Sequence, residues 1–196
     1  MISDVPISPP ARREILGFAR SVVACALRGE PVGEPYPTWQ CYSLLQRCCG
    51  VFVTMEKGAQ LRGCIGELGD RFPLHRGIRV CAVKAALEDP RFPPVTAPEL
   101  SVLTFSVSIL SRPQPIQARG LERAAVLVPH RDGVILEVGR RRSTFLPRVW
   151  QQYENPQDFL SQLCVKQGAS PDCWTDPEVR LLQYETTDLK ESSPQD

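Results

Sequence analysis

The chain has 196 residues with 23 basic and 22 acidic side chains, so its formal net charge is +1. This length fits one domain, or one domain with a small lobe, and can bury a hydrophobic core. The balanced charge argues against non-specific nucleic-acid binding. The N-terminus does not resemble a signal peptide, and no apolar run is long enough to span a membrane. We therefore expect a cytoplasmic protein with mostly reduced thiols and neither a membrane nor a nucleic acid as partner.

Hydrophobic periodicity predicts a first helix over residues 10–27, with Ser8 as its N-cap and Gly29 as its end. β-branched and aromatic residues over 51–55 predict a strand. A turn then leads to a partner strand over 60–65, which completes a hairpin.

Further along the chain, residues 74–87 have the spacing of a second helix. Three prolines within residues 89–94 predict a stiff, extended segment. The clearest alternation of apolar and small polar residues predicts a strand over 103–109. Three further short strands are expected at 125–128, 133–138 and 143–145.

The last predicted elements are a helix from Asn155 to about Gln167 and a strand over 178–185. Helices and hairpins are mixed without repeated strand–helix–strand units, which indicates an α+β class with a mainly antiparallel sheet and flanking helices.

The most informative motif is Leu61–Gly66, which reads L-R-G-C-I-G. Glycines at 63 and 66 permit a tight turn or the close approach of a ligand. The permanent charge of Arg62 would favour thiolate over thiol at Cys64. Cys64 is therefore a candidate catalytic residue, with Arg62 as a second. The alternative is a small buried cysteine beside a surface ion pair.

The proline-rich segment adds three candidates. Asp89 is a candidate acid–base group beside the thiol, whereas Arg91 and Phe92 are candidate ligand-binding residues together with the two glycines of the motif. The alternative is that Asp89 and Arg91 brace the segment against the sheet and that Phe92 fills the core.

The eight cysteines do not have the spacing of a metal site. No C-x-x-C pair occurs, and Cys48 and Cys49 are adjacent. The dinucleotide fingerprint, the phosphate-binding loop and the nucleophile-elbow serine are also absent. We predict neither a metal nor a cofactor.

Taken together, six segments resemble the AMMECR-type domain family. In chain order they are Gly50–Met55, Leu61–Gly66, Asp89–Pro94, Phe105–Leu110, Asp132–Leu136 and Thr144–Pro147. The resemblance places the domain at residues 11–187, after an N-terminal extension (1–10). The tail over residues 188–196 is polar, and we expect it to be disordered. Residues 139–150 look most like bacterial members.

The resemblance implies a two-lobed α+β fold with a larger and a smaller lobe. It also implies association with a Memo-type protein and a radical S-adenosylmethionine enzyme, as in the AmmeMemoRadiSam system. Three hypotheses for function remain open. The first is an enzyme or enzyme component that uses Cys64 in a cleft on a small anionic molecule or nucleotide. The others are a non-catalytic ligand-binding protein and an adaptor for the Memo-type protein.

Overall fold

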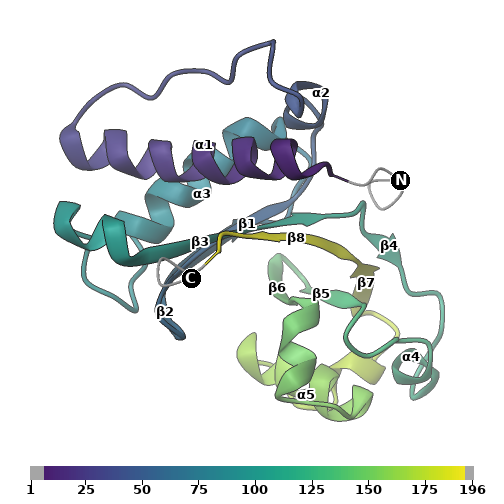
Figure 1. Cartoon of the computed structure of the whole chain (residues 1–196). Helices are drawn as coiled ribbons and strands as arrows, with labels where there is room; N and C mark the ends of the chain where they lie inside the picture. The colour runs from purple at the N-terminus through teal and green to yellow at the C-terminus, as the bar shows by residue number, and fades with distance from the viewer. Residues whose placement is uncertain (1–6, 193–196) are drawn as a thin grey trace. The chain divides into compact units, whose positions relative to one another are not determined.

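The computed structural model describes residues 7–192 and divides into two compact units. The larger unit contains the chain through Leu110 and again from Thr187, and the smaller contains Ser111–Thr186. Each holds one four-stranded sheet, with strand order β2-β1-β3-β8 in the larger unit and β4-β7-β5-β6 in the smaller (Figure 1). The α+β class with antiparallel pairing, flanking helices and two lobes is therefore confirmed.

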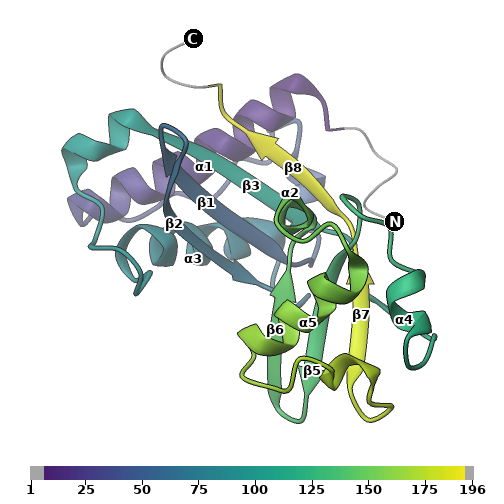
Figure 2. The same ribbon diagram turned by 90° about the horizontal axis from the view of Figure 1, so that it is seen from below.

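Two long helices cover one face of the larger sheet. Helix α1 (Pro9–Arg28) begins where Ser8 accepts a hydrogen bond from the backbone of the first turn, and it ends at Gly29 in the left-handed conformation. Helix α3 (Leu74–Leu87) packs against α1 and against two strands of the sheet. Both helices lie on the same side of the sheet (Figures 1 and 2). The two helices predicted here are confirmed.

The larger sheet consists of β1 (Val51–Lys57), β2 (Gln60–Glu67), β3 (Leu103–Leu110) and β8 (Thr186–Lys190). Strand β1 pairs antiparallel with both β2 and β3. The predicted hairpin and the strand over 103–109 are thus confirmed.

Strand β8 corrects the predicted C-terminal tail. Residues 188–190 belong to this strand, and Leu189 is fully buried in the core of the larger unit. Glu191 follows directly and bonds through both its backbone and its carboxylate to the backbone of Phe105. A single apolar residue in a polar run gave too weak a periodic signal to predict a strand. Residues 193–196 lie outside the described residues, as do residues 1–6 of the predicted extension, whereas α1 already begins at Pro9.

The smaller sheet is formed by β4 (Gln114–Pro115), β5 (Gly133–Val138), β6 (Arg141–Phe145) and β7 (Arg180–Tyr184). Helix α5 (Pro156–Lys166) shares a hydrophobic core with these strands and lies over β5 and β6 in Figure 2. Asn155 caps this helix as predicted.

The predicted strand over 125–128 is wrong. The chain instead forms a short helix, α4 (Glu122–Ala125), followed by a turn. The backbone N–H of Val128 donates to the carboxylate of Asp132 at 2.9 Å, and the carbonyl of Val128 accepts from the Asp132 backbone at 3.0 Å. A side chain and a turn therefore take the hydrogen bonds that a neighbouring strand would need.

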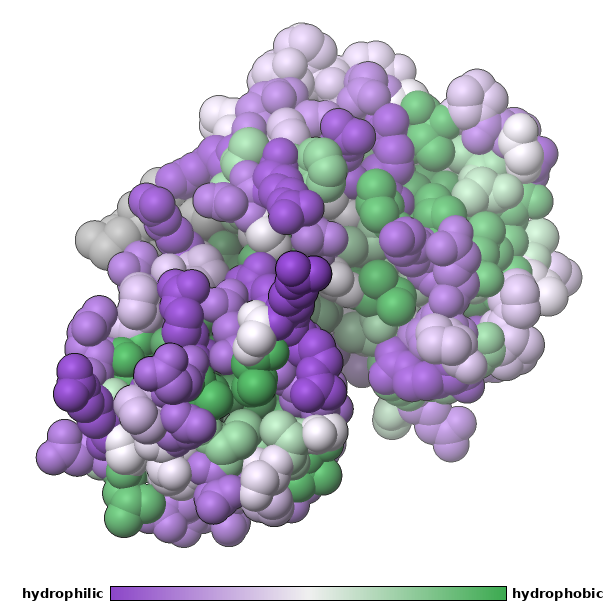
Figure 3. All heavy atoms as spheres, turned by 180° about the vertical axis from the view of Figure 1, so that it is seen from behind, coloured by the Kyte–Doolittle hydropathy of each residue, from purple (hydrophilic) through white to green (hydrophobic). Residues whose placement is uncertain are grey.

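Shorter elements connect these parts. They are α2 (Tyr42–Leu45) and the 3-10 helices η2 (Ala97–Val102), η3 (Pro147–Gln151) and η4 (Cys173–Thr175). Figure 3 shows hydrophobic residues interspersed with polar ones on the visible surface of both units. Within residues 7–192, no helix combines the length and apolar character needed to cross a membrane.

Candidate functional site

Cys64 lies in a polar row across the larger sheet. The register pairs it with Thr54 of β1, and Thr54 in turn pairs with Ser106 of β3. Val53 and Met55 alternate with Thr54 and point into the core beneath the helices, so the row lies on the opposite face. Thr54 is buried, whereas Cys64 and Ser106 are half-buried. The Thr54 hydroxyl donates to the Cys64 sulfur at 3.1 Å.

The backbone of Cys64 is fixed by two charged side chains. Its N–H donates to the carboxylate of Asp89 at 2.9 Å, and its carbonyl accepts from the guanidinium of Arg91, also at 2.9 Å. Asp89 and Arg91 are themselves joined by two side-chain hydrogen bonds of 2.7 and 2.9 Å, and the Arg91 N–H also donates to the carboxylate. A turn over Asp89–Phe92, rather than a fully extended segment, brings the two side chains to β2.

These contacts define the role of Asp89. Hydrogen bonds from Arg91 and the Cys64 backbone lower the pKa of the buried carboxyl to about 2. The carboxylate is therefore ionised at neutral pH and has no proton to give, and its oxygens are already occupied by donors. This geometry favours bracing over the acid–base role predicted from the sequence.

Arg62 is directed to a different partner. Its guanidinium makes two bonds of 3.1 Å to the carboxylate of Glu99 and one of 3.3 Å to the carbonyl of Pro94. The pairing of β1 with β2 shifts here, and Arg62 is skipped in the register, so strict alternation does not apply to it. Arg91 is the arginine that bonds to Cys64. Proximity in sequence favoured Arg62 as the neighbour of Cys64, but the fold places Arg91, 27 residues after Cys64, against its backbone.

Both glycines of the motif are required by packing. A Cβ on Gly63 would lie 2.2 Å from the carbonyl oxygen of Ala85 in α3, and one on Gly66 would lie 2.2 Å from the ring of Phe52. Neither glycine has a positive φ. The protein itself makes a close approach at both glycines, and their role in binding a ligand stays a prediction.

Phe92 is half-buried, and its ring lies 5.5 Å from the guanidinium carbon of Arg91. Burial raises the pKa of three other cysteines of the larger unit, to about 12 for Cys41 and Cys81 and to about 11 for Cys49, which disfavours their thiolate forms. Across the described residues, no group of three or more His, Cys, Asp or Glu side chains is placed to hold a metal ion. The absence of a metal and a cofactor stays a prediction.

Sequence reasoning missed Thr54 and Ser106 as neighbours of the thiol. The alternation in β3 indicated a face of small polar residues. Only the register of β1 with β2 on one side and with β3 on the other places Ser106 in the row of Cys64.

The sequence and the fold of this chain are similar to those of known proteins. A model of the AMMECR1 family matches residues 16–189. The chain belongs to the AMMECR1 family. A Thermococcus gammatolerans protein is 39% identical over 151 residues, which cover 74% of each chain. A Thermoplasma acidophilum protein is 34% identical over 197 aligned residues, covering 99% of this chain and 94% of its own.

A solved structure of the same fold is the crystal structure of the uncharacterized protein PH0010 from Pyrococcus horikoshii. It matches with a TM-score of 0.85 and 31% identity over 92% of this chain and 91% of its own. These AMMECR1-family relatives are archaeal, and the bacterial character expected from residues 139–150 stays a prediction.

Proposed function

We propose that this AMMECR1-family protein is a small-molecule-binding enzyme, or a component of one, in which the thiol of Cys64 is the reactive group. The observation that carries the proposal is the row on the polar sheet face. There the sulfur of Cys64, a half-buried residue, accepts a hydrogen bond from Thr54 while Asp89 and Arg91 fix the Cys64 backbone. A sulfur held in one position on a rigid strand meets the geometric requirement for a nucleophile.

A small anionic substrate or a nucleotide fits the charges near the thiol. The side chain of Arg91 is 52% exposed, so part of its guanidinium remains open to a ligand. Arg62 keeps one terminal nitrogen without a hydrogen-bond partner, but that nitrogen is buried, so Arg91 is the arginine placed to meet a ligand. We further propose a cytoplasmic pathway that includes a Memo-type protein and a radical S-adenosylmethionine enzyme.

The alternative is a non-catalytic ligand-binding protein or an adaptor for the Memo-type protein. One observation favours it: the protein itself engages three of the predicted site residues. Gly63 and Gly66 accommodate close packing, and Arg62 pairs with Glu99.

We expect iodoacetamide at neutral pH to label Cys64 about tenfold faster than Cys25, because the hydrogen bond from the Thr54 hydroxyl holds the Cys64 sulfur in one position on the sheet. Cys25 is a matched control, since it too is half-buried and has an arginine, Arg28, at 3.7 Å from its sulfur. Mass spectrometry of digested protein measures both rates. Labelling of Cys64 at or below the rate of Cys25 would contradict a reactive thiol.

We expect Cys64→Ser to abolish rescue of a deletion strain while leaving the melting temperature within about 2 °C, because the change is nearly isosteric at a half-buried position. Cys25→Ser, as the control, should rescue fully. If Cys64→Ser rescues and still co-purifies with a Memo-type partner, the adaptor hypothesis is supported instead.

A further inference from the structure

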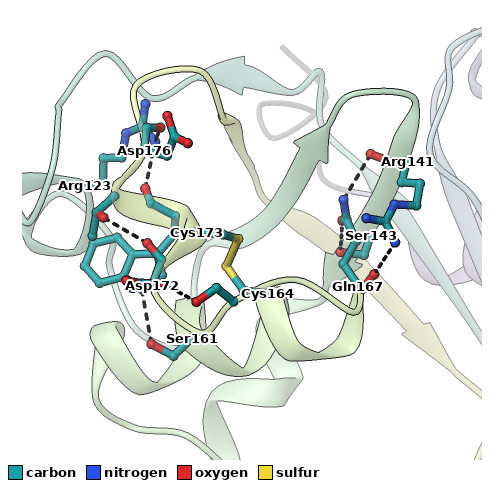
Figure 4. Close-up of a disulfide and its surroundings, with 12 residues drawn as sticks. Arg123, Arg141, Ser143, Ser161, Cys164, Gln167, Asp172, Cys173 and Asp176 are labelled. Carbon is teal, nitrogen blue, oxygen red and sulfur yellow. Dashed lines mark hydrogen bonds between the residues drawn. A yellow bond between two sulfur atoms is a disulfide. The ribbon is translucent and has the colours of Figure 1, made fainter.

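A disulfide joins two elements of the smaller unit. Cys164, in the last turns of α5, is bonded to Cys173 at the start of η4, with 6.2 Å between their Cα atoms (Figure 4). Cys164 is fully buried, whereas Cys173 is half-buried. The bond corrects the expectation that these two thiols are reduced. Sequence spacing gave no sign of a partner for either residue. The cysteines at 25, 41, 48, 49, 64 and 81 form no disulfide.

The chain between these cysteines is anchored at its beginning by Gln167. The side-chain carbonyl of Gln167 accepts from the hydroxyl of Ser143 at 2.6 Å, and its amide donates to the carbonyl of Arg141 at 3.2 Å. The guanidinium of Arg141 returns a bond of 3.2 Å to the Gln167 carbonyl (Figure 4). This end of the loop is therefore held on β6 without the disulfide.

The other end is anchored by Arg123, a buried arginine of α4. One terminal nitrogen donates to the carbonyls of Trp174 and Asp176 at 2.7 and 2.9 Å. The Trp174 side chain is buried in the core of the smaller unit, and its indole N–H donates to Ser161 of α5 at 3.2 Å. These contacts hold η4 against α4 and α5 independently of the sulfur–sulfur bond.

Because both ends of the loop are anchored without the sulfurs, opening the bond leaves the two thiols close together. We propose that Cys164 and Cys173 form a reversible dithiol–disulfide couple that exchanges with small thiols such as glutathione through the sulfur of Cys173. The redox state of the couple sets the mobility of residues 168–172 and leaves the smaller unit folded. This inference is independent of the function proposed for Cys64.

The exchange proceeds in two steps. A glutathione thiolate attacks the sulfur of Cys173, the half-buried residue of the pair, the disulfide breaks, and Cys164 leaves as a thiolate that takes up a proton. A second glutathione thiolate then attacks the glutathione sulfur of the mixed disulfide, releasing Cys173, which is also protonated, together with glutathione disulfide. Two electrons pass from two glutathione molecules to the protein disulfide, and two protons end on the cysteines.

The test equilibrates the full chain with glutathione and glutathione disulfide in graded ratios, followed by acid quenching, alkylation and mass spectrometry. We expect both thiols to appear together while circular dichroism stays unchanged. Amide hydrogen exchange over residues 168–172 should become at least about tenfold faster on reduction, and exchange in α5 should not. Loss of the smaller unit's structure on reduction, or thiols that appear only on unfolding, would overturn the proposal.

Single-cysteine variants test the site of attack. In Cys164→Ser the remaining Cys173 should form a mixed disulfide with glutathione disulfide, releasing one glutathione thiolate, at least about tenfold faster than Cys164 does in Cys173→Ser, because Cys173 is half-buried whereas Cys164 is fully buried. Equal or reversed rates would overturn attack at Cys173.

Variants of the anchors test the role of the fold. Arg123→Met should make the couple about tenfold easier to reduce, since the thiols would no longer be held together. Arg119→Met, which changes an exposed arginine three residues before the first residue of α4, should have no effect. Gln167→Ala alters the other anchor more mildly and gives the same test if Arg123→Met does not fold. If both anchor variants are half-reduced at the same glutathione ratio as the unmodified protein, the anchors do not hold the two thiols together.

Discussion

Gly63→Ala is expected to destabilise the larger unit by about 3 kcal/mol, the upper part of the range for overpacked cores. The added methyl group would lie 2.2 Å from the carbonyl oxygen of Ala85 and 3.2 Å from the terminal methyl of Met55. The first of these contacts is with the backbone of α3, so relief requires β2 or the helix to shift. Urea denaturation followed by circular dichroism measures the change.

Two further glycines provide controls for this substitution. At Gly66 the obstacle is the ring of Phe52, a side chain that can rotate, so Gly66→Ala should cost less than Gly63→Ala. Gly17 is exposed in the middle of α1 with nothing within 4 Å of an added Cβ. Gly17→Ala should therefore stabilise the protein by up to about 1 kcal/mol through helix propensity. A Gly63→Ala protein as stable as the unmodified one would disprove the close contact between β2 and α3.

The second large effect is expected for Asp89→Ala, which should lower the free energy of unfolding by about 2–3 kcal/mol. The Cys64 N–H loses its acceptor, and the guanidinium of Arg91 loses its partner. The cost stays below that of breaking a fully buried pair because the side chain of Arg91 is 52% exposed and can return to water. Asp89→Asn should cost less, since its side-chain oxygen can still accept the N–H.

The low pKa of Asp89 gives this prediction a pH signature. Its carboxyl has an ordinary pKa of 3.8 when unfolded and about 2 in the folded protein. Its contribution is therefore complete above the unfolded value and is lost as the pH falls through the folded value. The difference in stability between the unmodified protein and Asp89→Ala should thus shrink by about 2 kcal/mol between pH 5 and pH 2.

Glu99, whose pKa Arg62 and the Thr96 backbone also lower to about 2, titrates in the same window. It does so in both proteins, so the difference between their curves isolates Asp89. A difference that stays constant down to pH 2 would mean that the carboxylate does not pair with Arg91 in solution.

The contacts of Asp89 and Arg91 with the Cys64 backbone also protect an edge of the larger sheet. In the order β2-β1-β3-β8, strand β2 lies at an edge, where backbone groups are open to pairing with another chain. Asp89 and Arg91 occupy the N–H and the carbonyl of Cys64 at that edge. The two charged side chains therefore block pairing at this residue while they position the thiol.

Local patterns in the sequence determined most of the elements of this protein. The apolar stripes and end residues of α1, α3 and α5, the hairpin of β1 and β2 and the alternation of β3 each depend on neighbours a few residues apart. Such patterns are visible in a single sequence because helix and strand periods are short. Where the pattern was weak, as at Leu189, or its backbone bonds were taken by a turn, as at Val128, the prediction failed.

The site depended on contacts that no local pattern records. Arg91 rather than Arg62 reaches Cys64 because the turn after α3 runs beside β2, and Ser106 joins the row because of strand register. Cys164 meets Cys173 because Trp174 packs into the core of the smaller unit. Residue types and spacing determined the candidates and the fold class, whereas packing of distant segments decided which side chains became neighbours.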